Sequence, residues 1–474
     1  MNPTLLAGLR SLGIAVSFCA AALAQIPFTT GNLVLVRVGD GAAALTNAAT
    51  PVFVEEYTPA GALVQSIPMP TVASGTNQRL LMSGTATSEG FLNLSTNGLF
   101  LMLGGYDAAP GTASIATSVN PGVARVIARI DPAGTVDTST ALTDAFSGRN
   151  LRSVASDDGF RYWAAGSGEG VRFVPITGST TSVSLGNNPL NSRVLQVYNG
   201  QVYGSAASTT YHGLFKVGDG LPTVTAVGAL EPGFSASSGP SIYDYYFASP
   251  TTVYVADDRT SNAISGVPNG GIFRFDYNFG LATWVYSYQL SLGSSTGCRG
   301  LSGFRQNGVT TLWGTAVTSS GATSLVSIVD NGPTSTPTTL AVAPPNTAFR
   351  GVRFYGQPTT LVRFPAGCGA MDIQVTGNAQ LGTEIVTTFK NSVYGYSVLG
   401  FGDQLVLANL CPACMQFHNW FVYVIGNNLT LTLPNSPTIL GVVLYMQGLD
   451  YLAPNGCTLP EAFTFTDGYA FTVQ

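Results

Sequence analysis

The sequence predicts an all-β protein, a β-propeller followed by a small antiparallel β-sandwich, and three observations support this class. Only 9% of the 474 residues are charged, against about 25% in an ordinary soluble domain, and 56 are glycine. Short apolar or alternating runs end at Gly, Asn, Asp or Pro, without a sustained 3.6-residue apolar stripe. Several segments also resemble one another at a spacing typical of propeller blades.

Residues 1–24 are predicted to be an export signal. Arg10 supplies the positive charge, LGIAVSFCAAALA supplies the apolar stretch, and Ala22-Leu23-Ala24 forms an A-x-A cleavage site before Gln25. A membrane anchor is the alternative, but the apolar run is shorter than the ~20 residues that a membrane span needs. We therefore expect an extracytoplasmic protein, located in the periplasm, on the outer surface or outside the cell.

The charge balance argues against nucleic acid as a partner. Loss of Arg10 with the signal leaves 18 basic and 24 acidic residues, whereas phosphate binding needs clustered Lys and Arg. After signal removal we also expect no transmembrane span. The best remaining apolar run, ILGVVLYMQGL from Ile439, has about half the required length.

Internal similarity predicts that residues 25–360 form the propeller. Segments that start at Asn150, Asn191, Ser241 and Gly297 share one order of strand, tight turn, second strand, variable loop and third strand. Their turns and one earlier turn recur at separations of 41 to 61 residues, at Asn97-Gly98, Asp158-Gly159, Asn199-Gly200, Ser249-Pro250 and Asn307-Gly308. Asn-Gly and Asp-Gly suit two-residue type I′ turns, in which both central residues have positive φ. Such strands also build sandwiches and barrels, but this period with about four strands per unit is typical of propeller blades.

The two ends of this region predict how the ring closes. AFRGVRFYGQP, from Ala348, starts a further unit and stops after its first strand, whereas NLVLVRVGDG through ALVQSIPMP contains later strands without a first one. Joined, they make one composite blade, which removes an exposed sheet edge. With units that start near Glu89 and at the four segments above, the count is six blades. A seventh blade between Leu80 and Ala145 is the alternative.

Residues 361–474 are predicted to be a separate β-sandwich. Four of the five cysteines outside the signal fall here, and strand-like runs such as IVTTFKNSV, YGYSVLGFG and FVYVIGNNLTLTLP follow one another. Gly367-Cys368-Gly369, the central Cys pair, LPNSPTILGVVLYMQGLDYLAPNG and the closing TDGYAFTV resemble a β-rich C-terminal module that ends many secreted and surface proteins of environmental bacteria. This resemblance implies secretion and modularity and no enzymatic activity.

Cys368, Cys411, Cys414 and Cys457 are predicted to form two disulfides, because the chain is expected to be exported. The C-x-x-C pair also raises zinc, haem and redox chemistry. Haem attachment needs a histidine where Met415 stands, zinc needs a second such pair, and redox exchange needs a helix that the sequence does not offer. Three connectivities are open, and we favour Cys368 and Cys457 each bonding one member of the central pair. Cys298 is expected to be a buried thiol.

Three other chemical candidates are favoured as structural residues. His418 and Trp420 could form a ligand-stacking patch, but an aromatic cluster beside cysteines is more often core. His212 has no nearby Cys or Asp at metal-binding spacing. Ser295 lies in a G-x-S-x-G match, yet that nucleophile elbow must lead into a helix, and a strand is expected to follow. No metal site and no cofactor are predicted.

One basic constellation emerges from the repeats. Arg152, Arg193, Arg299 and Arg350 stand at the same place, near the start of a unit's first strand, in LRSV, SRVL, CRGL and FRGV. First strands line the centre of a propeller, so four guanidiniums facing one funnel would attract a carboxylate, sulfate or phosphate. The favoured alternative is structural: each arginine pairs with the backbone or an acid of a neighbouring blade.

The sequence therefore predicts a secreted or cell-surface binding protein without an identifiable catalytic constellation, whose partner is an unknown protein or glycan. The alternative is a propeller hydrolase or lyase that acts on an anionic saccharide or lactone, with the arginines holding its carboxylate. The full Asp-box pattern of sialidases is missing, and the acidic pairs Asp157-Asp158 and Asp257-Asp258 lie in predicted turns.

Overall fold

The computed structural model describes the backbone of most of the chain after the predicted signal. It covers residues 25–355 except 97, 187–188, 209–210, 236–238, 262–269 and 307, and the segments 362–364, 372–377, 384–390, 398–402, 405–411, 414–418, 422–426, 428–432, 443–451 and 463–472. These residues are almost entirely strand and loop, with one 3₁₀ turn, η1 (Ile115–Thr117). No helix among them is long and apolar enough to cross a membrane.

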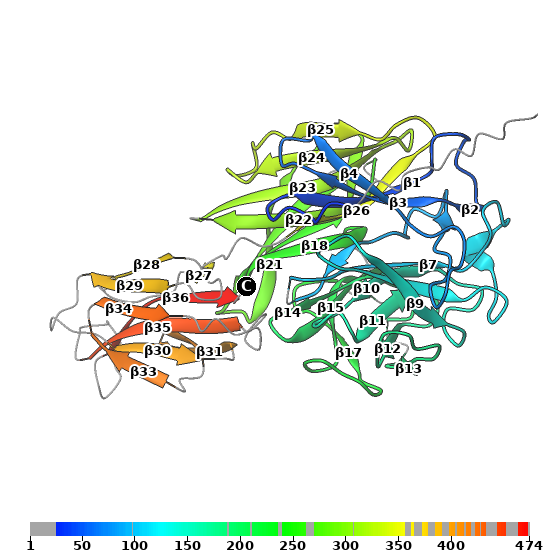
Figure 1. Cartoon of the computed structure of the whole chain (residues 1–474). Coiled ribbons are helices and arrows are strands. Elements are labelled where there is room, and N and C mark those ends of the chain that lie inside the picture. The colour runs from blue at the N-terminus through cyan, green and yellow to red at the C-terminus, as the bar shows by residue number, and fades with distance from the viewer. Residues whose placement is uncertain are drawn as a thin grey trace, which may run out of the picture.

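Six four-stranded antiparallel sheets form the blades of a β-propeller (Figure 1). From the centre outward, blade 1 contains β26 (Ala348–Phe354), β1 (Leu33–Val38), β3 (Val52–Tyr57) and β4 (Leu63–Pro68). Blade 2 contains β6 (Asn93–Leu94), β7 (Leu101–Tyr106), β8 (Arg125–Ile130) and β9 (Val136–Leu142). Blade 3 contains β10 (Leu151–Ala155), β11 (Tyr162–Gly166), β12 (Val171–Val174) and β13 (Val183–Ser184).

The remaining three blades follow in chain order. Blade 4 contains β14 (Ser192–Tyr198), β15 (Gln201–Ser208), β16 (Tyr211–Val217) and β17 (Gly228–Leu230). Blade 5 contains β18 (Ile242–Ser249), β19 (Thr252–Asp257), β20 (Gly271–Asn278) and β21 (Thr283–Leu290). Blade 6 contains β22 (Thr296–Gln306), β23 (Val309–Thr318), β24 (Thr323–Val329) and β25 (Thr338–Val342).

Blade 1 confirms the predicted composite blade. Its innermost strand, β26, comes from the end of the propeller sequence and pairs antiparallel with β1 from the beginning, with Leu33 opposite Phe354 and Val38 opposite Ala348. The blade count of six is confirmed as well. Between Leu80 and Ala145 the described residues form blade 2 and half of a two-stranded sheet, β2 (Ala49–Thr50) with β5 (Met82–Ser83), so the alternative of a seventh blade is wrong.

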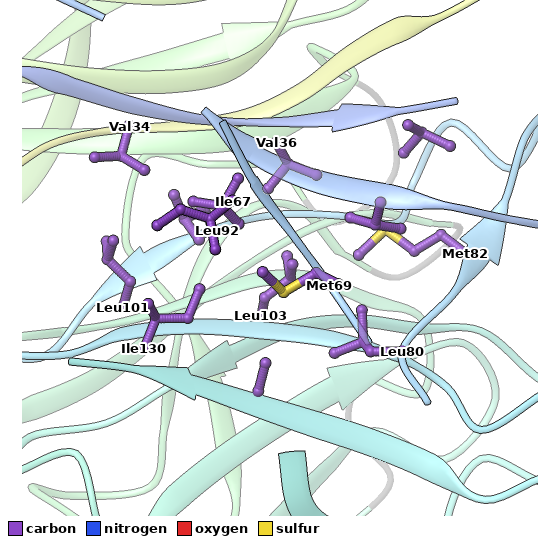
Figure 2. Close-up of a cluster of buried hydrophobic side chains, with 14 of the residues drawn as sticks. Val34, Val36, Ile67, Met69, Leu80, Met82, Leu92, Leu101, Leu103 and Ile130 are labelled. Carbon is purple, nitrogen blue, oxygen red and sulfur yellow. The ribbon is translucent and has the colours of Figure 1, made fainter. Parts of the chain in front are cut away.

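Apolar side chains between neighbouring blades form the core. Figure 2 shows the cluster between blades 1 and 2, where Val34 and Val36 of β1 face Leu101 and Leu103 of β7. Ile67, Met69, Leu80 and Met82 fill the space between them, and all of these side chains are at most 2% exposed. The faces of the inner strands are thus buried against adjacent blades, which explains why their sequences read as near-continuous apolar runs.

The innermost strands also bond directly to one another. The Leu195 amide of blade 4 donates to Ser153 Oγ of blade 3 at 2.9 Å. The Phe354 amide of blade 1 donates to Ser302 Oγ of blade 6, also at 2.9 Å. Short hydroxyl side chains in the inner strands therefore satisfy backbone groups of the next blade, which a purely apolar strand could not do.

Two predicted turns that the structure describes in full lie where the sequence places them, but only one has the predicted type. Asn199 and Gly200 have φ values of 47° and 68° between β14 and β15, as a type I′ turn requires. Between β10 and β11 only Gly159 has positive φ, and a longer loop replaces the two-residue turn. There Asp158 Oδ1 accepts the amide of Phe160 at 2.7 Å, so its side chain stabilises a wider turn than the sequence predicted.

The described residues after the propeller form ten further strands, which lie beside it (Figure 1). A five-stranded sheet has the order β27-β36-β35-β30-β33, a three-stranded sheet the order β28-β29-β34, and β31 pairs with β32. Their bounds are β27 (Val362–Phe364), β28 (Asp372–Gly377), β29 (Glu384–Lys390), β30 (Val398–Gly402), β31 (Leu405–Cys411), β32 (Cys414–His418), β33 (Val422–Ile425), β34 (Asn428–Thr432), β35 (Val443–Tyr451) and β36 (Phe463–Thr472). Their packing as a sandwich stays a prediction, and the predicted boundary at 360/361 lies outside the described residues.

The cysteine predictions have different outcomes. Cys298 is a free and fully buried thiol, as predicted, and burial raises its pKa. Cys411 and Cys414 face each other at the end of the β31–β32 hairpin, but only their backbones are described. Cys368 and Cys457 lie outside the described residues, so both disulfides stay predictions.

Candidate functional site

Five of the six innermost strands contain a β-bulge close to where they start. In blade 3, Leu151 pairs with Gly166 and Ser153 pairs with Ala165, so one extra residue stands between the pairs. The same shift occurs in β14, β18, β22 and β26. A bulge redirects the side chain that it contains. The residues that directly follow the last pair before each bulge are Arg152, Arg193, Tyr243, Arg299 and Arg350.

The structure gathers the four predicted arginines around Tyr243. The guanidinium carbon of Arg193 lies 3.9 Å from the Tyr243 ring centre, and that of Arg299 lies 6.0 Å from it. Tyr243 also interacts electrostatically with Arg152 and Arg350. We call the four arginines the arginine cluster. The side of the ring on which they lie is called the arginine face.

Blade 2, whose innermost strand has two residues, contributes Phe91 instead of an arginine. The Phe91 amide donates to the Arg152 carbonyl at 3.3 Å, which places this residue beside the start of β10. Its ring centre lies 5.7 Å from that of Tyr243 in blade 5, with a 43° tilt. Blades 2 and 5 are opposite in the ring, so the two aromatic residues meet across the centre. We call this pair the aromatic bar.

Arg152 and Arg193 make equivalent contacts with the next blade. Arg152 Nη1 donates to Asn191 Oδ1 at 2.5 Å and to the first carbonyl of β14 at 3.0 Å. Arg193 Nη1 donates to Ser241 Oγ at 3.1 Å and to the first carbonyl of β18 at 2.8 Å. All of these acceptors are neutral groups. The predicted structural role, in which an arginine joins neighbouring blades, is therefore observed, although neither arginine donates to a carboxylate among the described residues.

Arg299 and Arg350 complete the cluster on the other side of the aromatic bar. Arg299 Nε lies 3.4 Å from Asp258 Oδ2, a weak ion pair with the preceding blade. Arg350 Nη2 donates to the Gly84 carbonyl at 2.9 Å, and this side chain is only 3% exposed. The buried Nε atoms of Arg152 and Arg350 have no hydrogen-bond partner in the described part of the chain.

Burial and mutual repulsion make this cluster electrostatically costly. Burial lowers the pKa of Arg152 to about 10, and the charge of Arg193 adds to this shift. Burial likewise lowers the pKa of Arg350 to about 10, with Arg299 as the nearby charge. Both side chains therefore stay protonated at neutral pH. A buried guanidinium without a carboxylate partner favours the binding of an anion.

Glu89 is the buried acid behind the cluster. Its Oε1 accepts from Tyr106 Oη and Asn150 Nδ2, both at 2.6 Å, and its Oε2 accepts the Ser83 amide at 3.0 Å. Burial raises the pKa of this carboxyl, while these hydrogen bonds and the charge of Arg350 oppose the shift. Both carboxyl oxygens thus hold the segment that leads into blade 2, and the group offsets part of the positive charge.

His212 lies near Arg193, so the pKa of its imidazole reports on the positive charge of the arginine cluster. Burial and the Arg193 charge lower the pKa of its imidazole below 6.5. Because the unfolded imidazole keeps its usual value, this group makes the fold less stable as the pH falls below about 6.5.

We expect the Arg193→Gln variant to raise the pKa of His212 towards 6.5, because it removes the nearby positive charge. An NMR titration of the ring protons measures this change, and His418, the other histidine, can be replaced by asparagine to assign the signal. Arg129→Gln, on an outer strand, should leave the His212 pKa unchanged. An equal shift in both variants would contradict the proximity of His212 to the cluster.

A second layer of polar groups fills the centre of the ring below the aromatic bar. Asp244 is fully buried and accepts from Arg353 Nη1 at 2.6 Å and Nη2 at 3.0 Å. It also accepts Gln196 Nε2 at 2.9 Å and the Leu301 amide at 3.0 Å. Asn93 Oδ1 accepts Arg353 Nη2 at 2.7 Å.

Asn93 connects this layer to blade 3, the one blade not yet represented in it. Its Nδ2 donates to the carbonyls of Val154 and Leu195 at 2.7 and 2.9 Å. One network thus joins groups from all six blades, and every member named here has a hydrogen-bond partner. Sequence reasoning missed this layer, as it missed Tyr243 and Phe91.

The other sequence candidates do not assemble a catalytic centre in the described residues. Ser295 is exposed and leads directly into β22, so it lacks the helix that a nucleophile elbow requires. Asp157 and Asp257 are engaged by Arg161 and Arg259. No group of three His, Cys, Asp or Glu side chains suited to a metal occurs in the part of the chain that the structure describes. The side chains of His418 and Trp420 lie outside it.

Comparisons with known proteins identify no family. No protein-family model and no curated protein match the chain. Among solved structures, hydrazine synthase of Kuenenia stuttgartiensis is 9% identical with a TM-score of 0.35, covering 68% of this chain and 81% of that chain. A computationally designed protein is 13% identical with a TM-score of 0.31 and coverages of 74% and 85%. An exo-β-1,3-galactanase from Phanerochaete chrysosporium is 8% identical with a TM-score of 0.29 and coverages of 94% and 99%.

Proposed function

We propose that this protein is a binding protein that recognises an anionic group on a glycan or protein through the arginine cluster. One observation carries the proposal: the four arginines lie around Tyr243, and of these four only Arg299 has a described carboxylate within hydrogen-bond distance. The three other arginines donate to neutral groups. Glu89 and Asp258 offset only part of the positive charge, and an incoming carboxylate or sulfate would neutralise more of it.

Solvent can reach the cluster from the arginine face. Arg152, Arg193 and Arg299 are partly exposed, whereas Arg350 is buried. Arginine is suited to this role because its planar fork matches carboxylate and sulfate oxygens in pairs. The interblade contacts also hold each guanidinium in place, so an anion would meet a site that is already ordered.

Export is part of the proposal. The segment of residues 1–24 has the charge, apolar length and A-x-A site of a signal peptide, and the composition, low in charge and rich in glycine, is typical of extracytoplasmic β-proteins. N-terminal sequencing of the exported protein tests this directly, because the mature chain should begin at Gln25. A C-terminal β-sandwich with two disulfides belongs to the same proposal.

A hydrolase or lyase acting on an anionic saccharide or lactone remains the second proposal. Glu89 favours it, because burial raises the pKa of this carboxyl and Arg350 lies near it. Against it, both oxygens of Glu89 already accept hydrogen bonds from the protein. Release of products from acidic polysaccharides, lost in Glu89→Gln, would support the enzyme over the binding protein.

Sulfate and glucuronate should bind to the arginine face, and Arg193→Gln should weaken binding by about 10- to 100-fold, the value of one charge-assisted hydrogen bond. Isothermal titration calorimetry at constant ionic strength measures the affinities. Arg129→Gln is the matched control, since Arg129 pairs with Asp137 on the outer strands at 3.4 Å. Equal affinities for the parent protein and Arg193→Gln would exclude the cluster as the binding site.

A further inference from the structure

We infer that the ligand of the arginine face carries two anionic groups, one for each side of the aromatic bar. The inference rests on the proposed anion site and specifies its ligand. Around the ring the equivalent positions run Arg350, Phe91, Arg152, Arg193, Tyr243 and Arg299, in blades 1 to 6. The aromatic residues stand in opposite blades, so they divide the arginines into two pairs.

The first pair, Arg152 and Arg193, comes from the adjacent blades 3 and 4. Each is held by the start of the following blade, and the two charges lie close enough to influence each other. Arg193 also lies against the Tyr243 ring, with its guanidinium carbon 3.9 Å from the ring centre. Neither guanidinium donates to an acid among the described residues, so this pair presents two positive charges to one anionic group.

The second pair, Arg299 and Arg350, comes from blades 6 and 1. Arg350 is only 3% exposed, and its Nε has no hydrogen-bond partner in the described part of the chain. Arg299 is more accessible, with 15% of its side chain exposed, and Asp258 forms an ion pair with it. This pair is therefore a second, weaker site for an anion.

The aromatic bar prevents one small anion from serving both pairs. Phe91 and Tyr243 are 1% and 6% exposed and fill the centre between them. A single carboxylate on the Arg152 side would leave the charge of Arg350 offset only in part, by Glu89, whereas a ligand with two acidic groups adds a counter-charge to both pairs. Distances of 3.9 and 6.0 Å to the same ring centre place the carbons of Arg193 and Arg299 within about 10 Å of each other.

This span sets the chemical class of the ligand. Two carboxylates or sulfates that each meet a guanidinium must be separated by only a few bonds, as in a short dicarboxylate or in a saccharide with acidic groups on the same or adjacent sugars. Such groups make paired hydrogen bonds with arginine. A long polyanion is not required, and a ligand with one acidic group should bind much more weakly.

Acetate, succinate and adipate at constant ionic strength provide the test, with calorimetry of the full chain as the measurement. We expect succinate or adipate to bind at least about tenfold more tightly than acetate, because a second charge-assisted contact forms within one molecule. Arg193→Gln and Arg299→Gln should each reduce the dicarboxylate affinity to that of acetate, and Arg129→Gln should not. Urea unfolding verifies that each variant is folded, and Arg193→Lys, which keeps the charge, should retain part of the preference.

The outcomes separate this inference from the proposed function. If acetate and the dicarboxylates bind equally well and Arg193→Gln weakens all of them, the anion site stands and the two-group ligand is wrong. If none of the anions binds to the folded protein, the proposed function and the inference both fail. Loss of the dicarboxylate preference in Arg299→Gln but not in Arg129→Gln would support both.

Discussion

Replacing Asp244 by asparagine is expected to lower the free energy of unfolding by about 3 to 5 kcal/mol, because it leaves a buried guanidinium without its counter-charge. Asp244 is fully buried, and Arg353 donates to both of its carboxylate oxygens, at 2.6 and 3.0 Å. Asparagine would keep the shape of the side chain. It would also remove the negative charge and turn one acceptor into a donor that faces Arg353, so the loss goes beyond one hydrogen bond.

Urea unfolding followed by tryptophan fluorescence measures this effect. Asp137→Asn is the matched control, because its partner Arg129 is 3.4 Å away and both side chains are partly exposed, so its loss should cost less than about 1 kcal/mol. The double variant Asp244→Leu with Arg353→Met removes both charges and should recover part of the stability, but not all of it, because Gln196, the Leu301 amide and Asn93 lose hydrogen-bond partners. A single variant as stable as the control would show that the centre of the ring is hydrated in solution.

The blade count and ring closure followed from local patterns in the sequence. Asn199-Gly200 predicts a hairpin because Asn and Gly both tolerate positive φ, so the turn can be recognised from these two residues without knowing their surroundings. The incomplete units at both ends indicated a composite blade, since an unpaired inner strand is unfavourable. The tail was harder: FVYVIGNNLTLTLP was expected as one run, but β33 and β34 belong to different sheets, and the two members of the C-x-x-C pair stand on the paired strands β31 and β32.

The arginine positions were also visible in the sequence, because the repeats align them. Their surroundings were not, since they depend on residues that break the repeat. Tyr243 occupies the arginine position of its unit in SIYDYY, and Phe91 does so in a blade whose inner strand has only two residues. Asp244 and Arg353 are 109 residues apart in the chain and meet only because the ring closes. Pattern alone gives no signal for a contact across the centre.

Phe349→Ala is expected to lower the free energy of unfolding by about 3 to 5 kcal/mol, the usual loss for a large aromatic side chain removed from a core. Phe349 is 1% exposed in β26, and its ring centre lies 6.2 Å from that of Tyr57 on β3 in an edge-to-face arrangement. Its amide donates to Thr323 Oγ1 of blade 6 at 2.8 Å. The residue therefore packs against the rest of blade 1 and bonds the strand that closes the ring to blade 6.

Val342→Ala on the outer strand β25 is the control, because this side chain is 66% exposed and its loss should change stability by less than about 0.5 kcal/mol. Urea unfolding of both variants gives the comparison. The pairing of β26 with β1 joins segments about 300 residues apart, so its loop-closure entropy must be offset by contacts such as those of Phe349. If Phe349→Ala were as stable as Val342→Ala, β26 would not close the ring in solution, and the arginine cluster, to which β26 contributes Arg350, would not assemble as described.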